Sequence, residues 1–598
     1  MFVRKMRRCV WAVAAAMALA ASAAAAADPP RARLPLGSPN ALLCIRVKDL
    51  GSVIKAVTDV ASQFDPNAGP MVGMQMRAAL QKLPGIEENA PLAVLLLDPK
   101  KYKVPLVGVF TLKDPDLFKN IPDMQTVTVG KLGISANDEG AMAEVAQEIK
   151  AKGLRAVPTG DMTDMVVVSA DMPAVIKRYK MDIQGGLQLL KLKLGGMPAD
   201  PAAPPDPTRQ MGIKALGYVE KLVQAVEEQS GVVSMGATLT AREGTLNLAA
   251  DAVPGSDFAT FLRGMTTPAN KELTKFLPKE AYVTSVSTVD PAARAKLAVG
   301  MVKAVGDVLG LAQAETDTIC KVIHDATANM TGLEAGAAIA VKDGQAGIAL
   351  SGIRDKDKAR EITRGALALV KTGKIGEFFT KYGITVSLAE RHRNYQNIPV
   401  DKVEVVIDMD KLVAALPVPP EAKVNAKQQL GQVLKMAYGF ENKIVAEMVY
   451  GKKLVVVAYG LEYDKLIEKQ IGLMKSGGAD GIGSVAEYMA ALDRHPRSSS
   501  TLWHFSLFGY ADVLGKMMAK NMGPMMPANM FPTRAELPAK EVPISGSARV
   551  EGDRLLMTIH VPVDPIKAFA DVMKRKMQKA MQEMMQRGAE PGGVRDAR

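Results

Sequence analysis

The side chains best suited to chemistry gather in one segment, TLWHFSLFGY, at residues 501–510. Alternation along a β-strand would place Trp503, Phe505 and Leu507 on one face and the more polar set on the other, namely His504, Ser506, Phe508 and Tyr510. Such a face could contact a ligand, with His504 as a base, but a half-buried strand without a site explains the same pattern. The candidate ligand-contact residues are Trp503, His504, Ser506, Phe508 and Tyr510.

Methionine and cysteine raise the alternative of metal handling. The chain has 35 methionines, and thioether ligands suit Cu(I). The last cluster lies at helical spacing, which also indicates an ordinary apolar stripe; its members are Met573, Met577, Met581, Met584 and Met585. Cys320 and His324 are four residues apart in an expected helix, but two ligands do not hold zinc. We predict no metal site and keep Met-based copper handling as an alternative.

Motifs for covalent catalysis and cofactor binding are missing from the sequence. It contains no Gly-x-Ser-x-Gly elbow and no phosphate-binding loop. The GIGSVA stretch at 481–486 follows a loop where a dinucleotide fingerprint would need a strand. We therefore predict no catalytic residue and no cofactor, with a hydrolase of unrecognised type as an alternative.

The N-terminal segment predicts export. Four cations precede an apolar run from Val10 to about Ala20, and small residues follow to Ala27. This order is typical of a cleaved signal peptide at residues 1–27. No later run has the 18 uninterrupted apolar residues of a membrane span, so a periplasmic or extracellular location is expected.

Charge and cysteine content narrow the classes of partner. The formal net charge is +12, yet basic residues are mixed with acidic ones and aromatics make up 5% of the chain. A nucleic-acid surface concentrates its cations, so we predict no nucleic-acid partner. Cys44 and Cys320 remain after residues 1–27, and the sequence leaves open whether they form a disulfide.

Internal repetition is the strongest structural signal. Four segments consist of an apolar run, a glycine-bearing turn, a second apolar run and then a helical pattern; their glycines are Gly244, Gly344, Gly451 and Gly552. A tight turn between alternating strands predicts a β-hairpin. An aspartate at the end of the unit predicts the helix start, as at Asp114, Asp290, Asp355 and Asp564.

These units predict an α+β fold, with large antiparallel sheets covered on one face by helices. We expect two related modules, at 28–268 and 275–587, with a further boundary near 475–498 left open and a disordered tail at 588–598. The proline-rich stretch 195–208 predicts a linker inside the first module.

The last expected helix, 564–587, is amphipathic and basic. Lys574, Arg575, Lys576 and Lys579 lie beside its methionine stripe. Packing against the sheet is one interpretation. Contact with a membrane surface or a partner protein is the other.

Three patterns carry a resemblance to known proteins. They are the LPxxA-type start of a strand ending in Asp, the LLLDP…VPLVGVFTLKDPDLF hairpin, and the MVVVSADMPAV segment. In these the chain resembles large exported bacterial proteins whose domains have no known function. The resemblance implies the repeated architecture and supplies no catalytic residues. The expected function is therefore a non-catalytic protein of the cell envelope that acts by binding or assembly, or, alternatively, a periplasmic carrier of an apolar ligand such as lipid.

Overall fold

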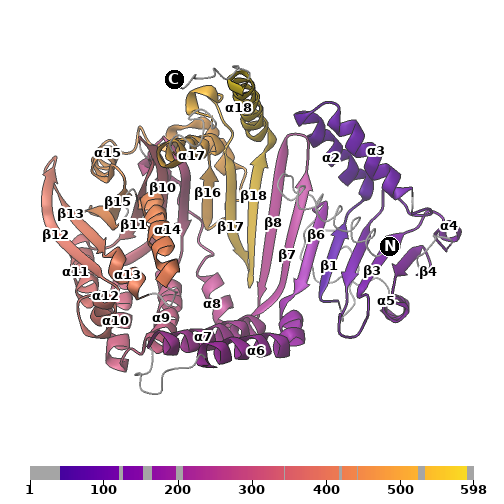
Figure 1. The fold of residues 1–598 in the computed structure, drawn as a ribbon, viewed down its shortest axis with the longest axis horizontal. Helices are drawn as coiled ribbons and strands as arrows, with labels where there is room; N and C mark the ends of the chain where they lie inside the picture. The colour runs from indigo at the N-terminus through magenta and orange to yellow at the C-terminus, as the bar shows by residue number, and fades with distance from the viewer. Residues whose placement is uncertain are drawn as a thin grey trace, which may run out of the picture.

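The computed structural model describes residues 41–81, 83–119, 125–152, 164–196, 207–342, 344–415, 420–438, 440, 442–522 and 532–588. Its main feature is one antiparallel sheet of 18 strands (Figure 1). The strands are β1 (Leu43–Val47), β2 (Leu92–Leu96), β3 (Leu106–Thr111), β4 (Gln125–Val129), β5 (Leu132–Ala136), β6 (Val166–Asp171), β7 (Ser230–Leu239), β8 (Glu243–Ala252), β9 (Ala281–Thr288), β10 (Met330–Val341), β11 (Gly344–Ile353), β12 (Ile384–Tyr395), β13 (Ile398–Ile407), β14 (Lys443–Tyr450), β15 (Leu454–Gly460), β16 (Thr501–Phe505), β17 (Ile544–Glu551) and β18 (Arg554–Pro562).

The strand pairs place β4 and β12 at the two edges of the sheet. The order between them is β4-β5-β3-β2-β1-β6-β7-β8-β18-β17-β16-β9-β10-β11-β15-β14-β13-β12, with every neighbouring pair antiparallel. Strand β8 of the expected first module pairs with β18 of the second, from Glu243 opposite Pro562 to Asp251 opposite Arg554. Strands of both modules therefore share one sheet.

Seventeen α-helices accompany the sheet in the described residues: α2 (Leu50–Phe64), α3 (Ala68–Leu80), α4 (Pro115–Lys119), α5 (Glu139–Lys152), α6 (Met172–Gly196), α7 (Pro207–Gln229), α8 (Asp257–Arg263), α9 (Pro291–Leu309), α10 (Gln313–Asn329), α11 (Lys356–Leu369), α12 (Gly373–Lys381), α13 (Met409–Ala414), α14 (Pro420–Tyr438), α15 (Tyr463–Lys475), α16 (Ala486–Asp493), α17 (Leu507–Met522) and α18 (Val563–Gly588). None of them is long and apolar enough to cross a membrane. The sheet and these helices together confirm the predicted α+β class.

Aspartate side chains begin several helices, as the sequence predicts. Asp355 accepts hydrogen bonds from the Asp357 and Lys358 amides at the start of α11, and Asp290 and Asp114 do the same for α9 and α4. These bonds satisfy amides that have no partner inside the helix. Asp564 differs, because α18 already begins at Val563.

Helices pack on both faces of the sheet, where one covered face was expected. Helix α5 buries Val145 and Ile149 against β2, β3 and β5 on one face. Helix α2 packs Val53 against β1, β2 and β6 on the other. The largest core lies on the α5 side, where α15 and α16 cover β9–β11, β15 and β16.

Several expected segments fall partly outside the described residues. The predicted signal peptide, 1–27, lies entirely outside them, as does 589–598 of the predicted tail. The predicted linker 195–208 is too long at both ends, because α6 continues to Gly196 and α7 begins at Pro207. A proline is readily accommodated in the first turn of a helix.

Candidate functional site

The four candidate residues expected on one strand face, His504, Ser506, Phe508 and Tyr510, do not share it. Strand β16 ends at Phe505 and α17 begins at Leu507, so the prediction of a strand through Tyr510 is wrong beyond Phe505. The Ser506 hydroxyl accepts a hydrogen bond from the Gly509 amide at 2.9 Å and thereby caps α17. Phe508 then points into the core at 1% exposure, and Tyr510 is 42% exposed.

His504 belongs to a closed polar chain. Its Nδ1 lies 2.5 Å from the Thr284 hydroxyl, which lies 2.9 Å from the Tyr488 hydroxyl, and the imidazole also makes a hydrogen bond with the Ala281 backbone. Burial lowers the pKa of His504 to about 3. An imidazole with so low a pKa is poorly suited to accept a proton from a substrate.

A pocket of about 470 Å³ adjoins this chain, between α16, α17 and the segment 534–543. Most of the charged side chains that line this pocket already make contacts within the protein. Glu541 receives hydrogen bonds from the Ser506 hydroxyl and the Phe508 amide at the start of α17, and burial raises its pKa. Asp512 pairs with Lys516 at 2.7 Å. The pocket therefore offers few free polar groups to a ligand.

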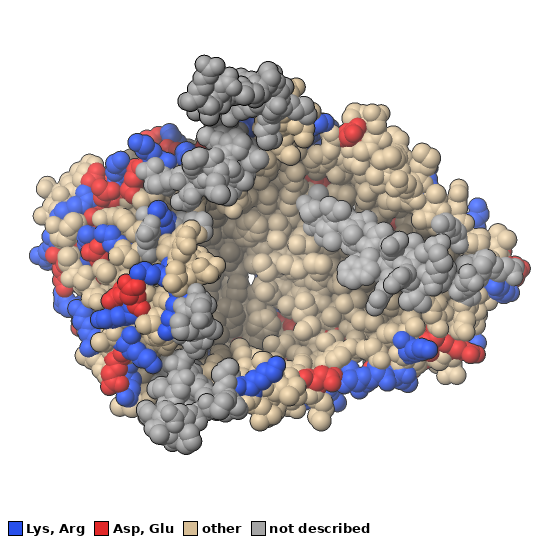
Figure 2. Space-filling view, viewed as in Figure 1, with Lys and Arg blue, Asp and Glu red and all other residues tan. Residues whose placement is uncertain are grey.

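The open surface of the molecule is the concave face of the sheet. Register defines it: Met235 lies opposite Leu248, Leu248 opposite Met557, Met557 opposite Ala548, and Ala548 opposite Thr501. Cross-strand partners point to the same side of a sheet. Figure 2 shows a deep hollow over these strands, with uncharged surface inside it and charged side chains gathered mainly over the β12–β13 end.

We call the part of this face on β6, β7, β8, β18, β17 and β16 the trough floor. No charged residue points to this side of these six strands, and its polar residues are Thr501 on β16 and Ser230 at the start of β7. Many of its apolar side chains are only partly buried. They include Val233, Met235, Leu246, Leu248, Met557 and Ile559.

The opposite face of the same six strands is polar, and much of it is buried. Ser234, Ser545 and Ser547 are each 2% exposed or less. Asp164 accepts hydrogen bonds from Thr238 and the Asn247 amide, both at 2.9 Å, and burial raises its pKa. These strands thus reverse the usual arrangement, in which the apolar face is covered and the polar face is open.

Aromatic rings on the concave face occupy the space beside glycines of the neighbouring strand. A Cβ atom at Gly546 would lie 2.1 Å from Trp503 Cε2, and one at Gly347 would lie 2.3 Å from Tyr459 Cζ. The glycines therefore leave space for rings that cover the exposed backbone. Trp503, one of the five candidate residues, is thereby fixed on the trough floor.

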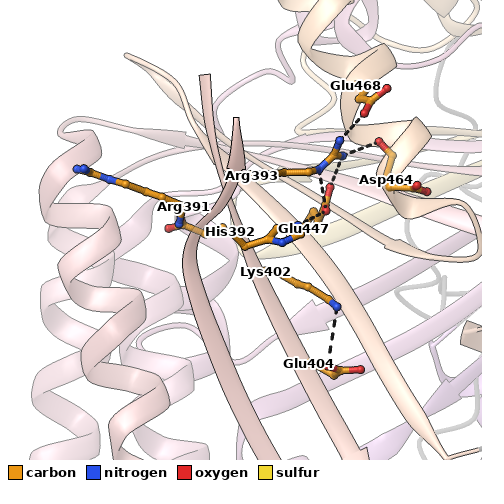
Figure 3. A network of polar contacts seen from close by, with 9 residues as sticks. Arg391, His392, Arg393, Lys402, Glu404, Glu447, Asp464 and Glu468 are labelled. Atoms are coloured by element: carbon orange, nitrogen blue, oxygen red, sulfur yellow. Dashed lines mark hydrogen bonds and ion pairs between the residues drawn. The ribbon is translucent and has the colours of Figure 1, made fainter. Parts of the chain in front are cut away.

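A buried ion-pair network holds the β12–β14 end of the sheet (Figure 3). Glu447 is 1% exposed. It accepts hydrogen bonds from Arg393 Nη2 at 2.6 Å and Nε at 3.0 Å, and lies 2.9 Å from His392 Nε2. Arg393 also bonds Glu468, and its carboxylate partners raise its pKa. Both oxygens of Glu447 have partners within the protein, so we interpret the network as structural.

Metal-ligating side chains do not converge within the described part of the chain. No cluster of three His, Cys, Asp or Glu residues there could hold a metal ion. Cys320 is buried while His324 is exposed on the same helix. Cys44 and Cys320 are both free thiols, and burial raises the pKa of Cys44 to about 11.

Helix α18 is packed at its start and open further along. Val572 packs with Phe508 and Leu537, whereas Met577 and Met581 are 58% and 57% exposed. Met584 and Met585 lie in a part of the helix whose side chains are outside the described set.

Comparison with known proteins yields no relative. No family model, no curated protein and no solved structure matches this chain. The geometry of the site is therefore the basis for function.

Proposed function

We propose that this chain is an exported, non-catalytic binding protein that holds an apolar ligand, such as a lipid chain, on the trough floor. The observation that carries the proposal is the reversed polarity of β6, β7, β8, β18, β17 and β16. Many apolar side chains on their concave face are only partly buried, whereas much of their opposite, polar face is buried. Large exposed apolar patches mark binding sites in soluble proteins.

The energetics favour a ligand made mainly of hydrocarbon. Each 100 Å² of apolar surface covered contributes about 2.5 kcal/mol. The floor offers no charged group to orient a polar ligand, and Met235 and Met557 can adapt to irregular chains. We therefore expect the trough floor to select ligands by their hydrocarbon content and not by a polar headgroup.

We also infer that the sheet arose by duplication of related units. The order of strand, helix pair, hairpin and helix occurs in β6-α6-α7-β7-β8-α8, in β9-α9-α10-β10-β11-α11 and in β13-α13-α14-β14-β15-α15. The antiparallel pairing of β8 with β18 then joins two halves at the centre of the floor. Such a duplication agrees with the resemblance to large exported bacterial proteins.

Trp503 provides a direct test. Trp11 lies in the predicted signal peptide, so Trp503 is the one tryptophan of the processed chain. A brominated fatty acid that occupies the floor should quench its fluorescence in a saturable titration. Leu248→Glu places a charge at the centre of the floor and should abolish the quenching.

A matched variant controls for the general effect of a new charge. Leu117 is 52% exposed on α4, near the β4 edge of the sheet, and Leu117→Glu should leave the titration unchanged. Ile559→Thr, a milder change on the floor, should weaken quenching if Leu248→Glu does not fold. A protein that shows no saturable quenching, and that carries no lipid detectable by mass spectrometry when purified, would refute the proposal.

A further inference from the structure

Three helices form a belt along the lower edge of the sheet in Figure 1: α6, α7 and α9. Ion pairs join them in that order. Lys180 lies 2.9 Å from Glu227 between α6 and α7, and Lys221 lies 3.8 Å from Asp307 between α7 and α9. We call these three helices the helical belt.

The helical belt exposes an unusual amount of apolar surface. On α6, Leu189 and Leu192 are 61% and 65% exposed. On α7, the residues Val219, Leu222 and Val226 form a stripe at helical spacing with exposures of 40% to 47%. Spacing of three and four residues puts such side chains on one helix face.

Helix α9 carries a matching stripe. Leu297, Met301 and Val305 are 48%, 54% and 47% exposed and follow one another at intervals of four residues. In the described part of α7 no residue is fully buried. The helical belt is thus a layer of helices whose apolar surface is only partly covered by the rest of the chain.

The charges of the helical belt leave an excess of cations. Lys177, Lys193, Lys214 and Lys303 are exposed, and no acidic side chain of the described residues pairs with any of them. Of the five belt acids, Asp182, Glu220, Glu227 and Asp307 each pair with a lysine. The fifth, Glu228, is exposed and accepts a hydrogen bond from the Gln224 side chain. Two copies of such a surface would repel each other.

We propose that the helical belt docks on an anionic lipid bilayer. Exposed leucine, valine and methionine can enter the region between headgroups and acyl chains, while lysines contact anionic headgroups. Helices α6 and α7 run along the lower edge of the sheet, so a docked belt would place that edge against the bilayer (Figure 1). The idea extends the proposed function, because a lipid carrier must reach its source, and its test does not depend on ligand binding.

Vesicle flotation tests the inference with purified protein. Binding is expected to vesicles of phosphatidylcholine and phosphatidylglycerol, and not to phosphatidylcholine alone. Each surface lysine contributes about 1 kcal/mol, so the triple variant Lys193→Gln, Lys214→Gln and Lys303→Gln should bind about 100-fold more weakly. Raising the salt concentration to 1 M should have a similar effect, because the screening length of electrostatic interactions falls to about 3 Å.

A control with the same change in charge separates the helical belt from net charge. Lys131, Lys150 and Lys453 are exposed on other elements and have no acidic partner among the described residues; their replacement by glutamine should leave binding within about threefold of the original. A double variant, Leu189→Asn and Leu192→Asn, should reduce binding with an unchanged melting temperature, because both side chains are exposed.

Several outcomes would overturn the inference. They are equal binding to neutral vesicles, an equal loss in the control triple variant, or absence of vesicle binding. A stable dimer that fails to bind vesicles would instead assign the helical belt to contact between copies. Leu248→Glu distinguishes the two proposals: it should abolish quenching of Trp503 and leave vesicle binding intact.

Discussion

Replacing Gly546 by alanine is expected to lift the Trp503 ring off the trough floor. The new Cβ would lie 2.1 Å from Trp503 Cε2 and 2.2 Å from Cζ2. Carbon atoms pack at about 3.5 Å or more, so the ring must move by roughly 1.4 Å. The Trp503 side chain is only partly buried, whereas Gly546 is held in a paired strand, so the ring should move further than the strand.

The change should be visible in both stability and fluorescence. Added volume in a packed site costs about 1–3 kcal/mol, measured as a lower urea midpoint. The displaced indole meets more water, so its emission should shift to longer wavelength. A Cβ atom added at Gly365, on α11, would have no neighbouring atom within 4 Å, and Gly365→Ala should instead stabilise by about 0.5–1 kcal/mol.

A double-mutant cycle makes the test specific. If the cost of Gly546→Ala arises from the indole, it should vanish in a Trp503→Leu background, which gives a coupling of about 1–3 kcal/mol. An unchanged emission spectrum together with an unchanged midpoint would show that the ring does not cover Gly546. The position assigned to Trp503 on the trough floor would then be wrong.

Further predictions concern the buried polar groups. Glu447→Ala leaves Arg393 without its buried partner and should cost about 3–5 kcal/mol in urea unfolding, whereas Glu468→Ala, at a site with 34% side-chain exposure, should cost less than about 1 kcal/mol; equal costs would contradict the structural role of the network. Burial lowers the pKa of His495 and His504 to about 3. Because these imidazoles take up protons near pH 6.5 only when unfolded, stability should fall from about pH 6.5 towards pH 3, by up to about 1.4 kcal/mol per pH unit for each, and His504→Asn should reduce this slope.

Local rules in the sequence account for the elements but not for their assembly. The alternation in β18 separates Leu555, Met557, Ile559 and Val561 from Thr558 and His560, and the hairpin and its turn follow from Gly552, whose φ is 63°. The aspartate signals at helix starts hold where α9 and α11 begin. Strand alternation, hairpin turns and helix caps depend on residues that are close in sequence, so they can be predicted from the sequence alone.

The candidate site depended on information that a sequence pattern does not contain. Alternation identifies two faces of a strand, but it does not say which face is covered. In TLWHFSLFGY the helix start at Ser506 interrupts the alternation, because a serine followed by a helical pattern serves as a cap as readily as a strand residue. Ser506, Phe508 and Tyr510 were grouped with His504 by a strand that in the structure ends at Phe505.

The positions of the helices favour a binding role for the open trough floor. The shortest way to cover an apolar sheet is to lay the helix pair that leaves a strand back across it, as α2 does over β1, β2 and β6. The equivalent pair after β6, α6 and α7, instead runs along the lower edge and exposes apolar stripes of its own. If the helices simply failed to complete a hydrophobic core, we would expect one uncovered apolar surface. Here two apolar surfaces, the trough floor and the helical belt, are exposed and lie next to each other. A hydrocarbon ligand on the first and a bilayer against the second would cover both surfaces, as the two proposals above require.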